Sequence, residues 1–337
     1  MKHYTNYSLL HNNTFGMDVL AEEFVEYNSI DELQEVVENL KGGRRRWFSI
    51  GGGSNLLFCQ DFEGTILHSC IKGIKIEEEN EKEVLVRVGA GEVWDSFVQY
   101  AVEREWYGCE NLSFIPGEVG GIAVQNIGAY GSEAKDTIEW VEVIEVSTNK
   151  ILRISNRDCE YDYRYSRFKE DWKEEYIITS VAFRLKKEKF LNIGYGELRR
   201  RLPQGEKLST LKEVRDNIIA IRKEKLPNPK EWGNAGSFFK NPYIGETQLK
   251  ELQEKFSEIP FYKVNDELYK LSSAWLIDQC GMKGYTIGKA KVCTTQPLVI
   301  VNLGGATAKD IIAVADSVYG AVADKFGVAL SEEVQYV

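Results

Sequence analysis

The sequence has few of the residues that build metal centres or disulfide frameworks. Its three histidines, His3, His11 and His68, are isolated from one another, and its six cysteines form no Cys-x-x-Cys pair. Scattered cysteines argue against structural zinc and against disulfides, and they fit a cytoplasmic protein. We therefore expect no metal and no histidine-based triad, so any acid–base chemistry must use other side chains.

Long apolar runs and large basic clusters are also missing. No run approaches the ~20 apolar residues that a membrane helix needs, and residues 1–6 lack the hydrophobic region of a signal peptide. The formal net charge of −10 argues against a nucleic-acid or acidic-membrane partner. The 337 residues, 43% of them hydrophobic and 28% charged, are typical of a soluble globular protein. We expect roughly two to three domains and a cytoplasmic monomer.

Strand and helix patterns are interspersed along the chain. Two alternating runs around Thr148 and Asn149 predict a hairpin, and capping boxes at 29–32 and 210–213 predict the starts of two amphipathic helices. The Pro-containing segment 226–229 ends the second of these helices and is the best candidate for a domain boundary. The expected strands are 47–50, 64–67, 84–88, 141–146, 150–154, 176–185, 298–302 and 327–337, and the expected helices are 30–40, 93–101, the segment from 211, 272–280 and 307–322.

A glycine run, Gly51-Gly52-Gly53, follows the strand predicted at 47–50. Consecutive glycines after a strand expose backbone N–H groups that can hold phosphate oxygens, and the Ser54 and Asn55 that follow add two further donors. The run is not a dinucleotide fingerprint, because Leu56 stands where the third glycine would fall. We therefore expect no Rossmann domain. The alternative to a phosphate loop is a plain tight turn.

The segment 115–131 contains five glycines and shows neither a strand nor a helix period. We expect a long ordered loop here, and loops of this length inside a domain are usually functional. The glycines allow close backbone approach to a planar ligand. Gln125 and Asn126 can hydrogen-bond the edge of a heterocycle, and Tyr130 can stack on one. These features favour a ligand-binding loop.

The segment 159–169 is rich in tyrosine and arginine, which is typical of a site for an anionic ligand. Arginine suits such a site because its planar guanidinium makes bidentate contacts with carboxylate or phosphate. The alternative is a surface strand with arginines that extend their charged ends into water.

The segment 233–242 places Ser237 between a flexible Gly-Asn-Ala-Gly run and two phenylalanines. The glycines let the backbone turn tightly, and the aromatic rings can fix the loop in a core. A hydroxyl held in this way can donate a proton to a reacting carbon. The alternative is an ordinary Gly/Asn turn before a proline.

Together these stretches resemble the UDP-N-acetylenolpyruvoylglucosamine reductase (MurB) family of peptidoglycan precursor synthesis. The matching segments occur in the family's order and span nearly the whole chain: 13–16, 51–57, 115–131, 163–164, 233–242 and 333–334. The resemblance implies an α+β fold, with a two-lobed FAD-binding domain of the vanillyl-alcohol-oxidase-like (PCMH) type and a third α+β substrate-binding domain. The implied boundaries are 1–72 for FAD lobe 1, 73–222 for FAD lobe 2, 223–324 for the substrate domain, and 325–337 for a C-terminal strand that returns to lobe 1.

The resemblance also implies a reaction. Tightly bound, non-covalent FAD would be reduced by NADPH, and the enolpyruvyl sugar nucleotide would then occupy the same cleft. Hydride from flavin N5 would add to the vinyl carbon, and Ser237 would protonate the neighbouring carbon. Arg164 would stabilise the enolate as it forms, and Glu333 would organise the carboxylate end of the substrate.

The family motifs assign further residues by match. Tyr163-Arg164 together with Tyr195-Gly196 indicates the subtype with a substrate-covering tyrosine loop. The implied substrate contacts are Tyr163, Tyr195, Lys225, Asn241 and Gln296, with Lys225 and Tyr195 as the diphosphate partners. The implied cofactor contacts are Gly51, Gly52, Gly53, Ser54, Asn55, Pro116, Gly117, Gly120, Gly121, Gln125, Asn126, Gly128, Ala129, Tyr130 and Gly131.

Two positions depart from the family pattern. Glu118 stands where a small or neutral residue is usual, which adds a negative charge to the segment expected to hold the flavin, and Ser331 replaces a frequent acidic residue. Two other functions fit part of the pattern. An FAD oxidase or dehydrogenase acting on another alcohol would keep both glycine loops but would not need Ser237 together with Glu333. A non-enzymatic sugar-nucleotide binder would keep flavin only as a structural group.

Overall fold

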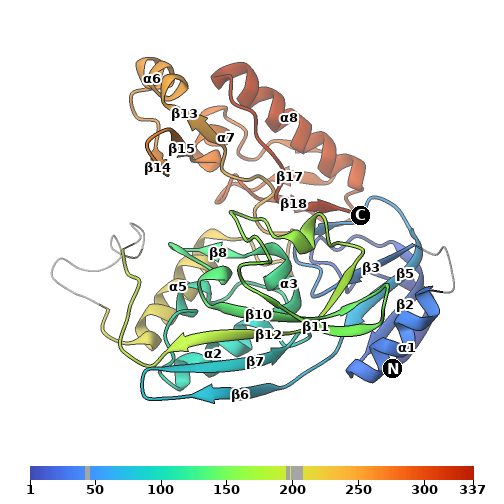
Figure 1. Cartoon of the computed structure of the whole chain (residues 1–337). Coiled ribbons are helices and arrows are strands. Elements are labelled where there is room, and N and C mark those ends of the chain that lie inside the picture. Colours follow the sequence, from blue (N-terminus) through green and yellow to red (C-terminus); the bar gives the residue numbers. More distant parts are fainter. Residues whose placement is uncertain (42–45, 195–197, 199–207) are drawn as a thin grey trace. The chain divides into compact units, whose positions relative to one another are not determined.

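The computed structural model describes residues 1–41, 46–194, 198 and 208–337, which form two compact units (Figure 1). The first unit comprises residues 1–7, 20–52 and 62–222, and the second comprises 8–19, 53–61 and 223–337. The chain passes from the first unit to the second for the last time after Arg222, inside helix α5 (Leu211–Lys225). The finer four-part division stays a prediction. Among the described residues, no helix is both long and apolar enough to cross a bilayer.

The first unit contains a four-stranded sheet in the order β1-β2-β5-β3. β5 pairs in parallel with β2 and with β3, and this register places Glu26 and Ile50 on either side of His68. Helix α1 packs its apolar face on this sheet through Leu33, Val36 and Val37. The bounds are β1 (Lys2–Ser8), β2 (Leu20–Tyr27), α1 (Ile30–Lys41), β3 (Trp47–Ile50) and β5 (Phe62–Ser69). The predicted helix and the predicted strands at 47–50 and 64–67 are confirmed, whereas β1 and β2 were not predicted.

A five-stranded antiparallel sheet forms the other layer of the first unit, in the order β11-β10-β12-β7-β6. One face carries the core, in which Trp94 and Phe97 of α2 pack on Phe183 with ring centroids 4.9–5.7 Å apart. The pattern of alternating apolar residues produces this buried face, and the predicted hairpin of β10 and β11 is confirmed. The bounds are β6 (Ile74–Glu79), β7 (Glu83–Gly89), α2 (Trp94–Glu103), α3 (Val119–Gln125), β10 (Ile138–Glu145), β11 (Lys150–Ser155) and β12 (Tyr176–Lys186).

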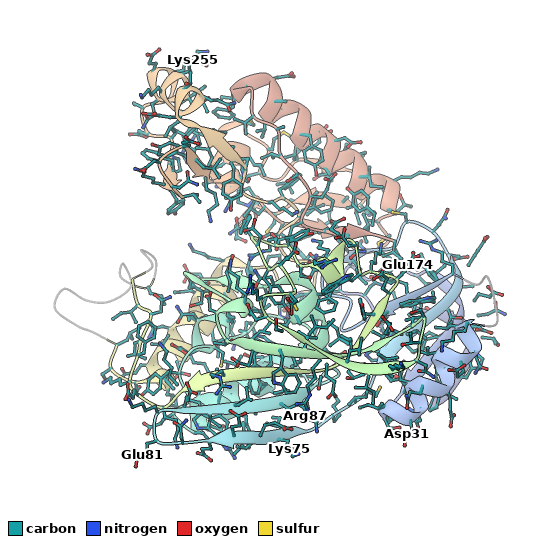
Figure 2. The ribbon with its side chains drawn as sticks, in the orientation of Figure 1. Asp31, Lys75, Glu81, Arg87, Glu174 and Lys255 are labelled. Carbon is teal, nitrogen blue, oxygen red and sulfur yellow. The ribbon has the colours of Figure 1, made fainter. Side chains whose placement is uncertain are left out.

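The opposite face of this sheet carries a polar cluster around Arg87, whereas Ile144 and Ile177 on the same face are buried with the core residues of α1. Figure 2 labels Lys75 on β6 and Arg87 on β7, which are register partners. Arg87 pairs with Glu77 at 3.1 Å and with the buried Glu142 at 3.4 Å. Glu81 lies in the turn that joins the two strands.

The prediction of an irregular loop over 115–131 is wrong, because α3 occupies its centre and two short strands follow, β8 (Gly128–Ala129) and β9 (Ser132–Glu133). Two glycines in the first turn of α3 lower the helix propensity of this segment, so its sequence did not predict a helix. Tertiary contacts hold the helix instead. The N–H groups of Val119 and Gly120 donate to the carbonyl oxygens of Glu92 and Ala90 at 2.9 and 2.8 Å, and Ile122 is buried.

The second unit combines two three-stranded antiparallel sheets with three helices. Helix α8 (Ala308–Phe326) starts with a capping box of Thr307 and Asp310. A two-residue strand, β19 (Gln335–Tyr336), pairs in parallel with β4 (Leu56–Leu57), so the predicted strand over 327–337 is shorter than expected. The helices predicted at 272–280 and 307–322 are confirmed. The remaining bounds are β13 (Tyr243–Gly245), α6 (Glu246–Lys255), β14 (Phe261–Lys263), β15 (Leu268–Leu271), α7 (Ser273–Gln279), β16 (Thr286–Ile287), β17 (Ala290–Val292) and β18 (Ile300–Asn302).

Candidate active site

Gly51 and Gly52 follow β3 directly and lie against the segment that begins at Pro116. A Cβ atom on Gly52 would come within 3.3 Å of the Gly117 Cα atom, and one on Gly51 would come within 3.4 Å of a Glu118 carboxylate oxygen. Backbone therefore approaches backbone, and glycine is favoured at both positions. The first unit thus brings together parts of the two glycine-rich segments predicted to hold the cofactor.

Gly53 and Asn55 belong to the second unit, where Gly53 lies against Asn12 and Asn55 contacts the C-terminal segment. Gly53 has a φ of 59°, and a Cβ atom there would lie 2.0 Å from the carbonyl oxygen of Asn12. Asn55 donates from Nδ2 to the carbonyl oxygen of Glu333 at 2.9 Å, and its own carbonyl accepts from the N–H of Gln335 at 3.0 Å. Asn55, at the end of the predicted phosphate loop, and the predicted catalytic Glu333 are therefore neighbours in this unit.

Asn126 ends α3 in the left-handed conformation, with a φ of 41°. Its Nδ2 donates to the carbonyl oxygen of Asp162 at 2.7 Å, and its Oδ1 accepts from the N–H of Lys135 at 3.0 Å. Both ends of this fully buried amide therefore contact protein. The side chain fixes the turn that carries Tyr163 and Arg164, and its expected contact with a ligand stays a prediction.

Arg164 sits in a tight turn closed by mutual backbone hydrogen bonds between Asp162 and Tyr165. Its φ of 55° is unusual for a residue other than glycine and costs free energy, which is a frequent property of functional sites. The guanidinium donates from Nη2 to the carbonyl oxygen of Gly128 at 2.6 Å and lies 5.2 Å from the Tyr163 ring centroid. The alternative of a surface strand over 159–169 is wrong, because this segment consists of turns and a 3-10 turn at Arg167–Lys169.

Arg222 is a candidate that the sequence motifs did not identify, and it lies near the end of α5. Its side chain donates from Nε to the carbonyl oxygen of Phe114 at 3.0 Å and hydrogen-bonds the side chain of Tyr130. Burial lowers the pKa of Arg222, and the interactions with Tyr130 oppose that effect. Among the described residues no carboxylate makes a direct ion pair with this guanidinium, although the charge of Asp95 acts to raise the same pKa and that of Arg164 acts to lower it. A half-buried cation in this state can accept an anionic ligand.

Ser237 lies in a segment whose backbone is fixed on both sides. The N–H of Gly236 donates to Oδ1 of Asn234 at 3.0 Å, and the rings of Phe238 and Phe239 are 0% and 1% exposed, as the sequence predicted. The carbonyl of Phe238 accepts from the N–H of Glu333 at 2.8 Å. Ser237 and Glu333 therefore lie on adjacent segments of the second unit, although almost one hundred positions separate them in the sequence.

Three of the predicted substrate residues lie in the same unit. Asn241 accepts at Oδ1 from the N–H of Ser273, the first residue of α7, at 3.0 Å. The carbonyl of Lys225 accepts from the Thr295 hydroxyl at 3.0 Å, which joins Lys225 to the turn of Gln296. Tyr195 lies outside the described residues. The predicted site residues of the first unit are Gly51, Gly52, the members of 116–131, Tyr163 and Arg164, and those of the second are Gly53, Ser54, Asn55, Lys225, Ser237, Asn241, Gln296 and Glu333.

Comparisons with known proteins also give two domains, although the FAD-binding model includes residues 53–61, which belong to the second compact unit. A family model described as an FAD binding domain matches residues 21–155, and one described as the UDP-N-acetylenolpyruvoylglucosamine reductase C-terminal domain matches residues 228–337. The solved structure of the enzyme named UDP-N-acetylenolpyruvylglucosamine reductase from Thermus caldophilus superposes with a TM-score of 0.68 at 21% identity, covering 99% of this chain and 98% of that one. The predicted α+β class, with an FAD-binding domain and a further domain, is confirmed.

Curated relatives extend the similarity over the whole sequence. The UDP-N-acetylenolpyruvoylglucosamine reductase of Bacteroides fragilis (strain YCH46) is 48% identical over 333 residues, which are 98% of this chain and 99% of the relative. The enzyme of the same name from Porphyromonas gingivalis (strain ATCC 33277) is 42% identical over 332 residues, which are 98% of each chain. The chain therefore belongs to the UDP-N-acetylenolpyruvoylglucosamine reductase family of FAD-dependent oxidoreductases.

Proposed function

We propose that this chain reduces UDP-N-acetyl-3-O-(1-carboxyvinyl)-glucosamine to UDP-N-acetylmuramate, with bound FAD as the cofactor and NADPH as the electron donor. The full-length relatives named as this reductase support the reaction. The observation that carries the proposal is the hydrogen bond from the N–H of Glu333 to the carbonyl of Phe238. It brings a hydroxyl and a carboxylate from distant parts of the chain onto neighbouring segments, an arrangement for which an oxidase of other alcohols has no evident use.

The residues present fit FAD. Gly51, Gly52 and Gly117 have no side chain that would separate their backbone N–H groups from a diphosphate. Arg222 offers a cation that the described residues leave without a carboxylate partner, and guanidinium groups bind phosphate and polarised carbonyl oxygens well. FAD bound at these segments would supply the hydride for the reaction.

Reduction of an enolpyruvyl ether adds a hydride to the terminal vinyl carbon and a proton to the carbon that bears the carboxylate. Negative charge develops on that second carbon and spreads into its carboxylate. Arg164 would stabilise this charge, because a fixed guanidinium gives short, charge-assisted hydrogen bonds to a carboxylate. Its contact with the Gly128 carbonyl is consistent with a guanidinium held in one place.

Ser237 would deliver the proton to the second carbon, and its oxygen would then take up a proton from solvent. The fixed backbone around Ser237 suits this role, since positioned proton transfer depends on geometry first. Glu333 would organise the carboxylate end of the substrate. Tyr163, Tyr195, Lys225, Asn241 and Gln296 would bind the sugar nucleotide, and NADPH would use the same site beforehand.

An anaerobic stopped-flow experiment tests the whole proposal. NADPH should bleach the flavin absorbance, and the enolpyruvyl substrate added afterwards should restore it with formation of UDP-N-acetylmuramate. A flavin that NADPH bleaches but that only oxygen reoxidises would favour an oxidase of other substrates. A flavin that NADPH does not bleach, or a protein that takes up no flavin, would refute the proposed reaction.

A further inference from the structure

His68 forms a link between two carboxylates in the first unit. Its Nε2 lies 3.2 and 3.3 Å from the two carboxylate oxygens of Glu118, and its Nδ1 lies 3.5 Å from Glu26. The His68 and Glu118 side chains are each only 15% exposed. The parallel register of β2, β5 and β3 produces this arrangement, because it places Glu26 beside His68 on one side and Ile50, the residue before Gly51, on the other.

Glu118 is the residue that makes this link relevant to the cofactor. It occupies the N-cap position of α3, where a short polar side chain is usual, and the structure shows no cap hydrogen bond from its side chain within the described ranges. The carboxylate turns to His68 instead and lies beside Gly51, since a Cβ there would meet Oε2 at 3.4 Å. An acidic side chain of one segment assigned to FAD thus lies against the other.

We propose that His68 is a positioning residue that holds Glu118 by an ion pair and cancels its charge, so that the Gly51–Gly52 and Pro116–Gly121 segments can bind the FAD diphosphate. The inference rests on FAD as the cofactor, as proposed above. Without the imidazolium, the Glu118 carboxylate would repel a diphosphate and would have no fixed place beside Gly51. The acidic residue at this position is therefore compatible with FAD only together with its histidine.

The charges around the cluster agree with a protonated ring. Burial acts to lower the pKa of His68, but the hydrogen bond and charge of Glu118, followed by those of Glu26, outweigh burial and raise this pKa above its ordinary value. Loss of the proton would leave two carboxylates facing a neutral ring. FAD affinity should therefore fall as the pH rises through the pKa of His68. Other titratable groups near the cluster include Lys2 of β1, which pairs with Glu26 at 3.3 Å, and Cys70 and Lys72, which follow β5. Tyr7 of β1 and Tyr27 of β2 also face it; burial raises the pKa of each, and the charges of Glu26 and Glu118, respectively, act in the same direction.

The experiment measures the FAD dissociation constant of the apoprotein from about pH 6 to about pH 9, the range in which a histidine titrates. FAD fluorescence reports binding without any turnover. For the wild type, the dissociation constant should rise about tenfold across this range, the effect expected for one unscreened charge near a phosphate. His68→Gln should bind FAD about tenfold more weakly at the acidic end and lose the pH dependence. His68→Gln combined with Glu118→Gln should recover the affinity of the wild type.

Two further variants keep the test decisive. Glu118→Gln alone should bind FAD tightly at both ends of the pH range. If circular dichroism shows that His68→Gln does not fold, the comparison of Glu118→Gln with the wild type still tests the inference. His3→Gln is the matched control, because His3 forms an exposed pair with Glu23 at 3.6 Å on the same sheet, and its profile should equal that of the wild type. Wild-type affinity in His68→Gln, or no rescue by Glu118→Gln, would overturn the inference. Failure of the wild type to bind FAD at any pH would instead overturn the proposed function.

Discussion

Replacement of Ser237 by alanine removes one hydroxyl from a segment whose backbone is held by other groups. The N–H of Gly236 bonds to Asn234, the N–H of Phe238 donates to the Leu298 carbonyl at 2.7 Å, and the adjacent aromatic rings are buried. None of these contacts uses the serine hydroxyl. We therefore expect the free energy of unfolding to change by less than about 1 kcal/mol. A loss of activity in this variant would then reflect the loss of proton transfer and not unfolding of the protein.

The loss should fall on one half-reaction only. Positioned proton transfer contributes about 10²–10⁴ in rate, equivalent to about 3–5 kcal/mol in the barrier. Ser237→Ala should therefore bleach with NADPH at the wild-type rate but reoxidise with the enolpyruvyl substrate at least about 100-fold more slowly. Anaerobic stopped-flow absorbance separates the two phases. Ser237→Cys, which keeps an acidic proton, should retain part of the second phase. Ser331→Ala, an exposed serine on the segment paired with Lys240, is the control. A normal second phase in Ser237→Ala would refute the role of this hydroxyl.

Four other changes test separate parts of the site. Arg164→Lys should slow substrate reduction by about 100-fold or more, because an ammonium group cannot make the two parallel hydrogen bonds that a guanidinium makes to a carboxylate. Near-normal single-turnover rates would show that Arg164 has no role in the mechanism. Arg222→Gln should weaken FAD binding about tenfold in a fluorescence titration, because it removes a cation that the described residues leave without a carboxylate partner; unchanged affinity would contradict that role. Gly53→Ala should lower the melting temperature, because φ is 59° and the new Cβ would lie 2.0 Å from a backbone oxygen; an unchanged melting temperature would contradict the strain. Asp95→Asn should cost about 3 kcal/mol in urea unfolding, because it breaks a bidentate pair with Arg215, which is 9% exposed. Burial acts to raise the pKa of Asp95 and Arg215 lowers it below its ordinary value, so the wild type should lose this stability as the pH falls through that pKa, and the variant should not.

The sequence predicted the main helices and the longer buried strands, but it missed β1, β2, β6 and α3 in the first unit and α6 with the strands β13–β17 in the second. Two of these misses have a clear physical cause. Strand β1 is polar and almost entirely exposed, so no hydrophobic alternation marks it. Helix α3 was not predicted because Gly120 and Gly121 lower its intrinsic helix propensity. Its first N–H groups donate to the carbonyl oxygens of Ala90 and Glu92, in the segment that follows β7, and these contacts show why it forms. Both cases illustrate how tertiary contacts override local preference.

For the candidate site, sequence reasoning identified the segments but not their connections. The glycine positions could be assigned from steric requirement alone, and Phe238 was expected in the core and is buried there. The hydrogen bonds from the Glu333 backbone to Phe238 and from Asn55 to Glu333 join segments far apart in the chain, which no periodicity reveals. Arg222 carried one weak signal, its place at the end of a helix before a proline break, and that signal fits an ordinary helix terminus equally well.

The hydrogen bonds also show that the asparagines and the arginines of the candidate site have different structural roles. Asn13, Asn126 and Asn234 direct their side chains to backbone groups of the protein, and each fixes a turn next to a candidate residue. Arg164 and Arg222 instead keep cationic groups at the segment 128–130, the first held by a carbonyl and the second by a carbonyl and a phenol. In a chain with a net charge of −10, these cations provide the local field that an anionic ligand needs. The asparagine amides thus fix the backbone turns, and the guanidinium groups make this region favourable for an anionic ligand.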